Sequence, residues 1–128
     1  MPSLDTNCLL RWLLNDVPEH TQRVAAAIAG ASQLAVSDVA LIEAGFVLER
    51  AMRFTRAEVA AAFGALATEK KFTFDREFWR AVTDLYVDHP KLSLADIYLA
   101  LDADRRAAAP LLTLDAKLAR QLPSAAPV

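Results

Sequence analysis

Glycine is scarce in this chain: three occur among 128 residues, at Gly30, Gly45 and Gly64. Neither a Gly-rich phosphate loop nor a GxGxxG fingerprint can be built from them, which excludes P-loop and Rossmann nucleotide chemistry. A single cysteine, Cys8, excludes an internal disulfide framework and any CxxC zinc site. No uncharged apolar run reaches the roughly 18 residues that a membrane span needs.

The chain also lacks an excess of positive charge. It has 14 Lys and Arg against 16 Asp and Glu, for a net charge of −2. Such a protein does not hold nucleic acid by bulk positive charge. Hydrophobic residues make up 55%, which excludes disorder, and the opening MPSLDTN has no basic segment typical of a signal peptide. We therefore expect one cytoplasmic domain over residues 1–128, with a frayed, disordered tail at 123–128.

Short apolar runs alternate with helical patterns along the chain. We predict strands at 3–5, 33–37, 72–74 and 110–114. We predict helices at 6–14, 18–30, 38–52, 55–70, 75–87, 94–108 and 115–121, the first capped by Thr6 or Asn7. Alternating strands and helices imply parallel crossovers. The predicted fold class is α/β, a three-layer α/β/α sandwich with a small central parallel sheet.

Two aspartates follow predicted strands. Asp5 closes the first strand, and Asp115 directly follows the apolar strand LLTL. In doubly wound folds, ligands gather at the carboxyl ends of strands. The alternative for each residue is structural, because aspartate is also a preferred N-cap of the helix that follows.

Two further acids interrupt apolar helices. Glu43 is the only charge in VALIEAGFVL, and Asp96 is the only charge in LSLADIYLAL. Burying a lone carboxylate is costly unless it is paired or binds a metal. For Glu43 the alternative is a buried ion pair with an arginine such as Arg50 or Arg53. For Asp96 it is a capping box, in which Ser93 caps the helix and Asp96 stands at N3.

Together these four acids indicate a metal centre, because parallel topology would bring all of them to one edge of the sheet. Carboxylates that cluster raise one another's pKa unless a cation is present. Mg²⁺, or alternatively Mn²⁺, takes oxygen ligands and suits such a cluster. At a phosphodiester, a cation of this kind stabilises in-line displacement by an activated water.

The same residues resemble a known family. The Leu4-Asp5-Thr6-Asn7 segment is similar to the opening DTN of PIN domains, and LIEAGFVLER around Glu43 is similar to the family's helical glutamate segment. LSLADIYLA resembles the segment of the third acid, and Thr113-Leu-Asp115 the closing TxD motif. The order, spacing and length are similar to those of the VapC-like toxin ribonucleases. The chain departs from the pattern in the short segment before Asp5 and in Ala109-Pro110, where a glycine often precedes the last strand.

This resemblance implies an α/β/α sandwich, divalent-metal-dependent cleavage of RNA, a homodimer and neutralisation by a small antitoxin protein. It implies that the metal-binding, catalytic acids are Asp5, Glu43, Asp96 and Asp115. Asn7 and Thr113 match accessory polar positions. Lys117 and Arg120, just after Asp115, are candidate contacts for substrate phosphates, although solvated surface positions explain them as well.

Two other functions remain open. One is a metal-free, PIN-like interaction domain, against which the four intact acids argue. The other is a Mg²⁺-dependent phosphotransfer or phosphatase module. Such enzymes have a DxD motif or two adjacent acids near the N-terminus, whereas Asp5 is followed by Thr6 and Asn7. Mg²⁺-dependent RNA cleavage, compared with phosphate release, separates these functions. We interpret Cys8 as core, and we assign no catalytic role to His20 or His89. Six aromatic residues are interpreted as core or interface rather than as base-stacking platforms: Trp12, Phe72, Phe74, Phe78, Trp79 and Tyr86.

Overall fold

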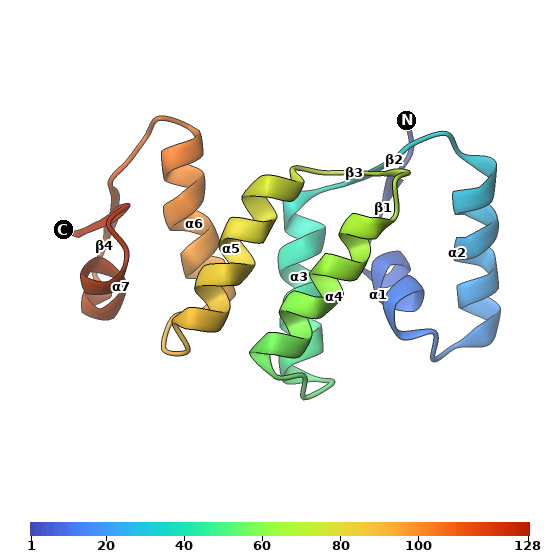
Figure 1. Cartoon of the computed structure of the whole chain (residues 1–128), viewed down its shortest axis with the longest axis horizontal. Helices are drawn as coiled ribbons and strands as arrows, with labels where there is room; N and C mark the ends of the chain where they lie inside the picture. Colours follow the sequence, from blue (N-terminus) through green and yellow to red (C-terminus); the bar gives the residue numbers. More distant parts are fainter. The chain divides into compact units, whose positions relative to one another are not determined.

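Short parallel strands connected by helices make up the computed structural model, which describes all 128 residues (Figure 1). The chain divides into a first unit, Met1–Glu77, and a second unit, Phe78–Val128. The first unit contains β1 (Ser3–Leu4), α1 (Thr6–Leu14), α2 (Pro18–Gly30), β2 (Leu34–Val36), α3 (Asp38–Arg50), α4 (Arg56–Thr68) and β3 (Phe72–Thr73). Helix α5 (Arg76–Asp88) crosses the boundary, and α6 (Leu94–Arg105), β4 (Leu111–Thr113), α7 (Ala116–Gln121) and β5 (Ala125–Pro127) follow.

The first unit contains a three-stranded parallel sheet in the order β1-β2-β3. Leu4 lies opposite Val36, and Leu34 lies opposite Phe72. A parallel pair needs a long crossover, and here helices α1 and α2, then α3 and α4, make these connections. The strands therefore end at the same edge of the sheet, and the residues after β1 and β2 become neighbours there.

Helix α1 packs against α2 and α3 and supplies much of the first unit's core. Leu9, Leu41 and Leu48 are completely buried, and the Trp12 ring meets Phe72 edge-on with a centroid distance of 5.3 Å. Each such side chain contributes about 1.5–3 kcal/mol by leaving water. This core fixes the start of α1 relative to α3, the two helices that carry the candidate acids Asp5 and Glu43.

The second unit contains a two-stranded parallel sheet made by β4 and β5. Leu111 lies opposite Ala125, and Thr113 lies opposite Pro127. The prediction of a frayed tail at 123–128 is therefore wrong for the last residues. Ala125 is buried, and the Val128 amide donates to the Thr113 carbonyl at 3.2 Å, so both burial and backbone pairing hold the C-terminus.

Aromatic side chains form the centre of the second unit. Trp79 is buried and stacks on Tyr98 with a centroid distance of 5.4 Å, while Phe78 meets both rings edge-on. This arrangement confirms the core role predicted for Trp79. Ile97 and Leu118 are also buried, so α6 and α7 both contribute apolar side chains to the core.

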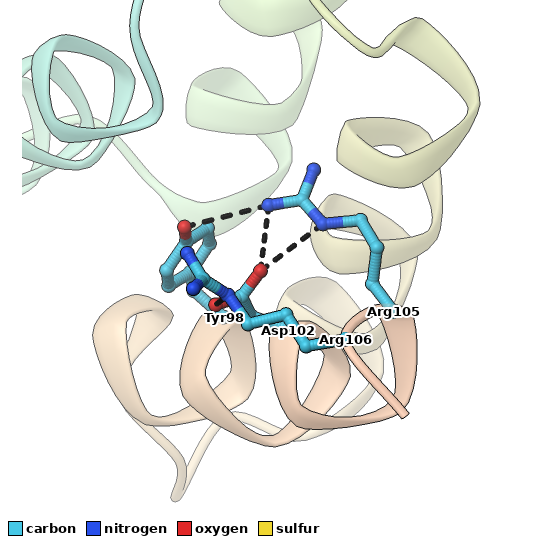
Figure 2. A network of polar contacts seen from close by, with 4 residues as sticks. All are labelled: Tyr98, Asp102, Arg105 and Arg106. Atoms are coloured by element: carbon cyan, nitrogen blue, oxygen red, sulfur yellow. Dashed lines mark hydrogen bonds and ion pairs between the residues drawn. The ribbon is translucent and has the colours of Figure 1, made fainter. Parts of the chain in front are cut away.

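The end of α6 carries a buried carboxylate held by two arginines (Figure 2). Asp102 is 8% exposed and accepts from Arg105 Nη2 at 2.7 Å and from Arg106 Nε at 2.7 Å. The Arg105 guanidinium also lies over the Phe78 ring, 3.7 Å from its centroid. Partners three and four residues away on one helix satisfy this charge, so we interpret the cluster as structural.

The predicted helices agree with the structure to within a few residues, and their caps explain most boundaries. Thr55 and Glu58 form the predicted capping box of α4, and the backbone amide of Thr55 holds the pKa of the Glu58 carboxyl below its ordinary value. The prediction of Thr6 or Asn7 as the cap of α1 is wrong, since Asp5 takes that position. None of the helices has the length and apolar character needed to cross a bilayer.

Candidate functional site

Asp5 is held in place by the start of helix α1. Its backbone is extended, and its Oδ1 accepts from the Cys8 backbone amide at 2.9 Å, which makes it the N-cap. This hydrogen bond lowers the pKa of the Asp5 carboxyl below its ordinary value of 3.8, so the group is ionised at neutral pH. The side chain is exposed. A carboxylate has about four lone-pair positions, and the cap occupies one of them.

Glu43 lies close to this helix start. The Thr6 Oγ1 donates to Glu43 Oε1 at 3.3 Å, which connects the first residue of α1 to the middle of α3. Asp5, Thr6, Glu43 and Ser37 line one pocket of about 330 Å³. Ser37 follows β2 and caps α3, its Oγ accepting from the Ala40 amide at 3.1 Å. The pocket is therefore built at the carboxyl ends of two adjacent parallel strands.

The burial that the apolar segment VALIEAGFVL implied for the Glu43 carboxylate is not observed, because Glu43 is exposed. Its apolar neighbours Val39 and Phe46, one turn away on either side, are 64% and 52% exposed. The alternative of an ion pair with Arg50 or Arg53 is also not observed. Arg50 instead lies over the Phe46 ring, 4.3 Å from its centroid. The face of α3 that carries Val39, Glu43 and Phe46 is therefore exposed, whereas Leu41, Ala44 and Leu48 on its other face are buried.

Asp96 stands in the first turn of α6 in the second unit. Its backbone amide donates to the Ser93 Oγ at 3.1 Å, which is the N-cap half of the predicted capping box. The carboxylate is half-buried. A negative charge in the first turn of a helix is favoured by the helix dipole, so a structural role and a ligand role are compatible here.

Asp115 caps α7, and Thr113 shapes the turn before it. Asp115 Oδ1 accepts from the amides of Lys117 and Leu118 at 2.9 and 3.3 Å. The Asp115 amide in turn donates to the Thr113 Oγ1 at 3.0 Å. Thr113 thus fixes the backbone from which the carboxylate projects. The side chains of Lys117 and Arg120 are exposed on the short helix that follows.

The structure brings Asp5 and Glu43 together in the first unit, through Thr6. Asp96 and Asp115 lie at the starts of two helices of the second unit. No group of three or more acidic, histidine or cysteine side chains forms a ready metal site. The convergence of all four acids stays a prediction from the sequence.

A protein-family model for the PIN domain matches residues 3–121, which includes both units and all four acids. The chain belongs to the PIN domain family. PIN domains are typically nucleases, and the α/β class with short parallel strands predicted from the sequence is confirmed and consistent with a PIN-like three-layer fold. Neither the curated proteins nor the solved structures contain a significant match to the chain.

PIN domains commonly use divalent metal ions, and the donor chemistry of the first-unit pocket fits such an ion. Carboxylate and hydroxyl oxygens, which Asp5, Glu43, Thr6 and Ser37 provide, suit Mg²⁺ and Mn²⁺. Both carboxylates are exposed and neither forms an ion pair within the first unit, so oxygen lone pairs remain for a cation.

Three features of the first unit were missed by sequence reasoning. Thr6 and Ser37 line the acidic pocket, and the signal for both was their position at the carboxyl end of a predicted strand. Asn7, predicted as an accessory residue, lines a second pocket with Cys8 and His20. Cys8 is half-buried beside this pocket rather than fully in the core, and burial raises the pKa of its thiol.

Proposed function

We propose that this PIN domain is a divalent-metal-dependent endoribonuclease, the toxin of a toxin–antitoxin pair. The observation that carries the proposal is the pairing of Asp5 and Glu43 in one open pocket at the carboxyl edge of the β1-β2-β3 sheet. The family match supports a nuclease in general. The metal, the RNA substrate and the toxin role are our inference.

The side chains of this pocket have distinct tasks in the proposed reaction. Asp5 is held ionised and fixed by the Cys8 amide, and Thr6 orients the Glu43 carboxylate by donating to Oε1. When bound, Mg²⁺ or Mn²⁺ supplies positive charge beside a phosphodiester and lowers the pKa of a coordinated water. We propose Asp96 and Asp115 as further ligands.

The accessory residues of the proposed site act through position. Thr113 holds the backbone of Asp115 through its hydroxyl, so that carboxylate is fixed before any ligand binds. Lys117 and Arg120 provide exposed positive charge shortly after it. We propose that these two residues contact substrate phosphates, which an overall acidic chain does not attract by its net charge.

An apolar surface next to the acidic pocket supports a protein partner. Val39 and Phe46 are exposed on α3 on either side of Glu43. Exposed apolar side chains grouped on one helix face are typical of an interface. We propose that a segment of a cognate antitoxin covers this surface and that the chain forms a homodimer. An arginine or lysine of the antitoxin placed against Glu43 would block a cation or phosphate there.

The activity is tested by incubating RNA with the chain in Mg²⁺ and in EDTA. We expect cleavage with Mg²⁺ or Mn²⁺ and none with EDTA. Glu43→Gln should reduce cleavage at least about 100-fold. Removing a residue that only hydrogen-bonds to a metal ligand already lowers metal affinity or activity 10–100-fold. Glu19→Gln, an equivalent change at an exposed position of α2, should leave the rate unchanged. Undiminished cleavage in EDTA contradicts the proposal, and phosphate release without RNA cleavage supports a phosphatase instead.

The partner proposal has its own measurements. Light scattering of the isolated chain at high micromolar concentration should give a dimer mass, and a strictly monomeric mass counts against the homodimer. Co-expression with the product of the adjacent gene should yield a complex that no longer cleaves RNA. The substitution Phe46→Ser should weaken that complex while RNA cleavage by the isolated chain is retained. A complex that forms but cleaves RNA normally contradicts the inhibitory model.

A further inference from the structure

A second pocket lies on the other side of Asp5, between helices α1 and α2 of the first unit. Its volume is about 350 Å³, which falls within the range of small-ligand sites. It shares Leu4 and Asp5 with the acidic pocket. Its other polar lining residues are Asn7, Cys8, Arg11, His20 and Arg23. The two pockets are therefore neighbours that meet at Asp5, a candidate metal ligand.

The second pocket is rich in cationic and hydrogen-bond-donating groups. Arg23 is exposed and forms no ion pair, so its full positive charge is available to a ligand. Arg11 is paired through Nη1 with Asp16 Oδ1 at 3.0 Å, while its buried Nε has no hydrogen-bond partner. His20 adds an exposed imidazole.

Negative charge in this pocket is confined to its border. Cys8 contributes a half-buried thiol to the lining and no carboxylate. Asp5 is the only carboxylate that lines the pocket, and its Oδ1 is turned to the Cys8 amide. Arg11 is already paired with Asp16, so the lining offers one unpaired guanidinium, that of Arg23, together with the donor groups of Arg11 and His20 against one carboxylate, and this arrangement favours an anion.

We propose that the pocket between α1 and α2 binds a phosphate of the RNA strand next to the one that is cleaved, with Arg23 as the main contact. This proposal rests on the proposed function. We place the adjacent phosphate of a strand whose reacting phosphodiester lies at Asp5 and Glu43 in the neighbouring pocket, because the two pockets share Asp5. Guanidinium groups bind phosphate through charge-assisted hydrogen bonds. Arg23 is a substrate-binding residue in this account and takes no part in the chemical step.

The test compares Arg23→Gln with Lys70→Gln in cleavage of a short fluorescent oligoribonucleotide at several salt concentrations. Lys70 is exposed and precedes β3, at the opposite edge of the sheet from Asp5, and its substitution changes net charge equally. One phosphate contact to a single strand contributes about 0.7 to the slope of log KM against log salt concentration. Loss of that contact therefore raises KM about fivefold at 0.1 M salt, relative to 1 M salt. Arg23→Gln should show this rise in KM and the shallower slope with kcat unchanged. Arg23→Lys should retain most of the slope.

The outcomes separate the subsite from the activity. If the wild-type chain cleaves RNA and Arg23→Gln behaves like Lys70→Gln, the phosphate pocket is refuted while the ribonuclease proposal stands. A pocket that takes a carboxylate of a protein partner would give this same result. If the wild-type chain cleaves no RNA, the proposed function fails. The slope of oligoribonucleotide binding then decides the pocket: a shallower slope for Arg23→Gln alone supports it, and equal slopes refute it.

Discussion

Asp5 carries two roles that substitution can separate. It caps α1 through the hydrogen bond from the Cys8 amide, and it is a proposed metal ligand through its charge. Asparagine caps a helix about as well as aspartate but carries no charge. Alanine has neither a capping oxygen nor a charge. Asp5→Asn should therefore retain stability and lose activity, and Asp5→Ala should lose both.

The expected magnitudes follow from the cap geometry. Replacing an N-cap acceptor by alanine costs about 1 kcal/mol, within a range of roughly 0.5–2 kcal/mol. In a chain of this length that lowers Tm by about 4 °C. Asp5→Asn should change the free energy of unfolding by only a few tenths of a kcal/mol, because the amide oxygen accepts from the same Cys8 amide. Both variants should lose RNA cleavage at least about 100-fold.

Thermal unfolding and an RNA cleavage assay on the same preparations measure both effects. Thr55→Ala is the matched control, because it removes the cap of α4, which lines neither pocket. This control should lower Tm and leave the cleavage rate unchanged. Cleavage by Asp5→Asn at the wild-type rate would refute the ligand role, and an Asp5→Ala variant with wild-type Tm would refute the cap.

The pH dependence of stability gives an independent check on the cap. The pKa of Asp5 is lower in the folded chain than its ordinary value of 3.8. Its contribution is therefore fully present above that value and is lost as pH falls through the folded pKa. The stability difference between the wild-type chain and Asp5→Ala should be constant near pH 7 and shrink below about pH 4, in urea unfolding at a series of pH values. A difference that grows on acidification would contradict the assigned cause.

Three further predictions concern other parts of the chain. Asp102→Ala should lower the free energy of unfolding by about 1–3 kcal/mol in urea, because it leaves two arginines without their shared acceptor, while exposed Asp84→Ala should have little effect. Deleting residues 125–128 should lower Tm by several degrees, because β4 then loses its only partner strand; an unchanged Tm would support a frayed tail. Thr6→Val should reduce cleavage about 10–100-fold with unchanged Tm, because it removes the hydroxyl that orients Glu43, and a rate equal to wild type would exclude that role.

The helices were predictable from the sequence because their signals are local. The capping pair Thr55 and Glu58, and Pro18 at the start of α2, place helix ends through neighbours within a turn. The strands were predicted within a residue or two of their ends. The pairing of β5 was missed, because AAP has no apolar alternation and acquires strand geometry only from its contact with β4.

The candidate site was predictable in its residues but less so in its surroundings. Asp5 and Asp115 were found because an acid directly after an apolar strand is a local signal. The exposure of Glu43 was not, because an apolar sequence around a charge does not reveal whether that face is covered. The cationic pocket was missed because Arg11 and Arg23 come from different helices, and only their tertiary packing places them beside Asp5.

We propose that Asp5, Glu43, Asp96 and Asp115 bind a common divalent cation. The most direct measurement is paramagnetic broadening of backbone amide signals by substoichiometric Mn²⁺ in the wild-type chain. We expect the amides of Thr6, Ala44, Ile97 and Ala116 to broaden together at the lowest Mn²⁺ concentrations, and Glu43→Gln to weaken all four effects. Broadening confined to one pair of acids, or equal broadening across the surface, would contradict a common metal site.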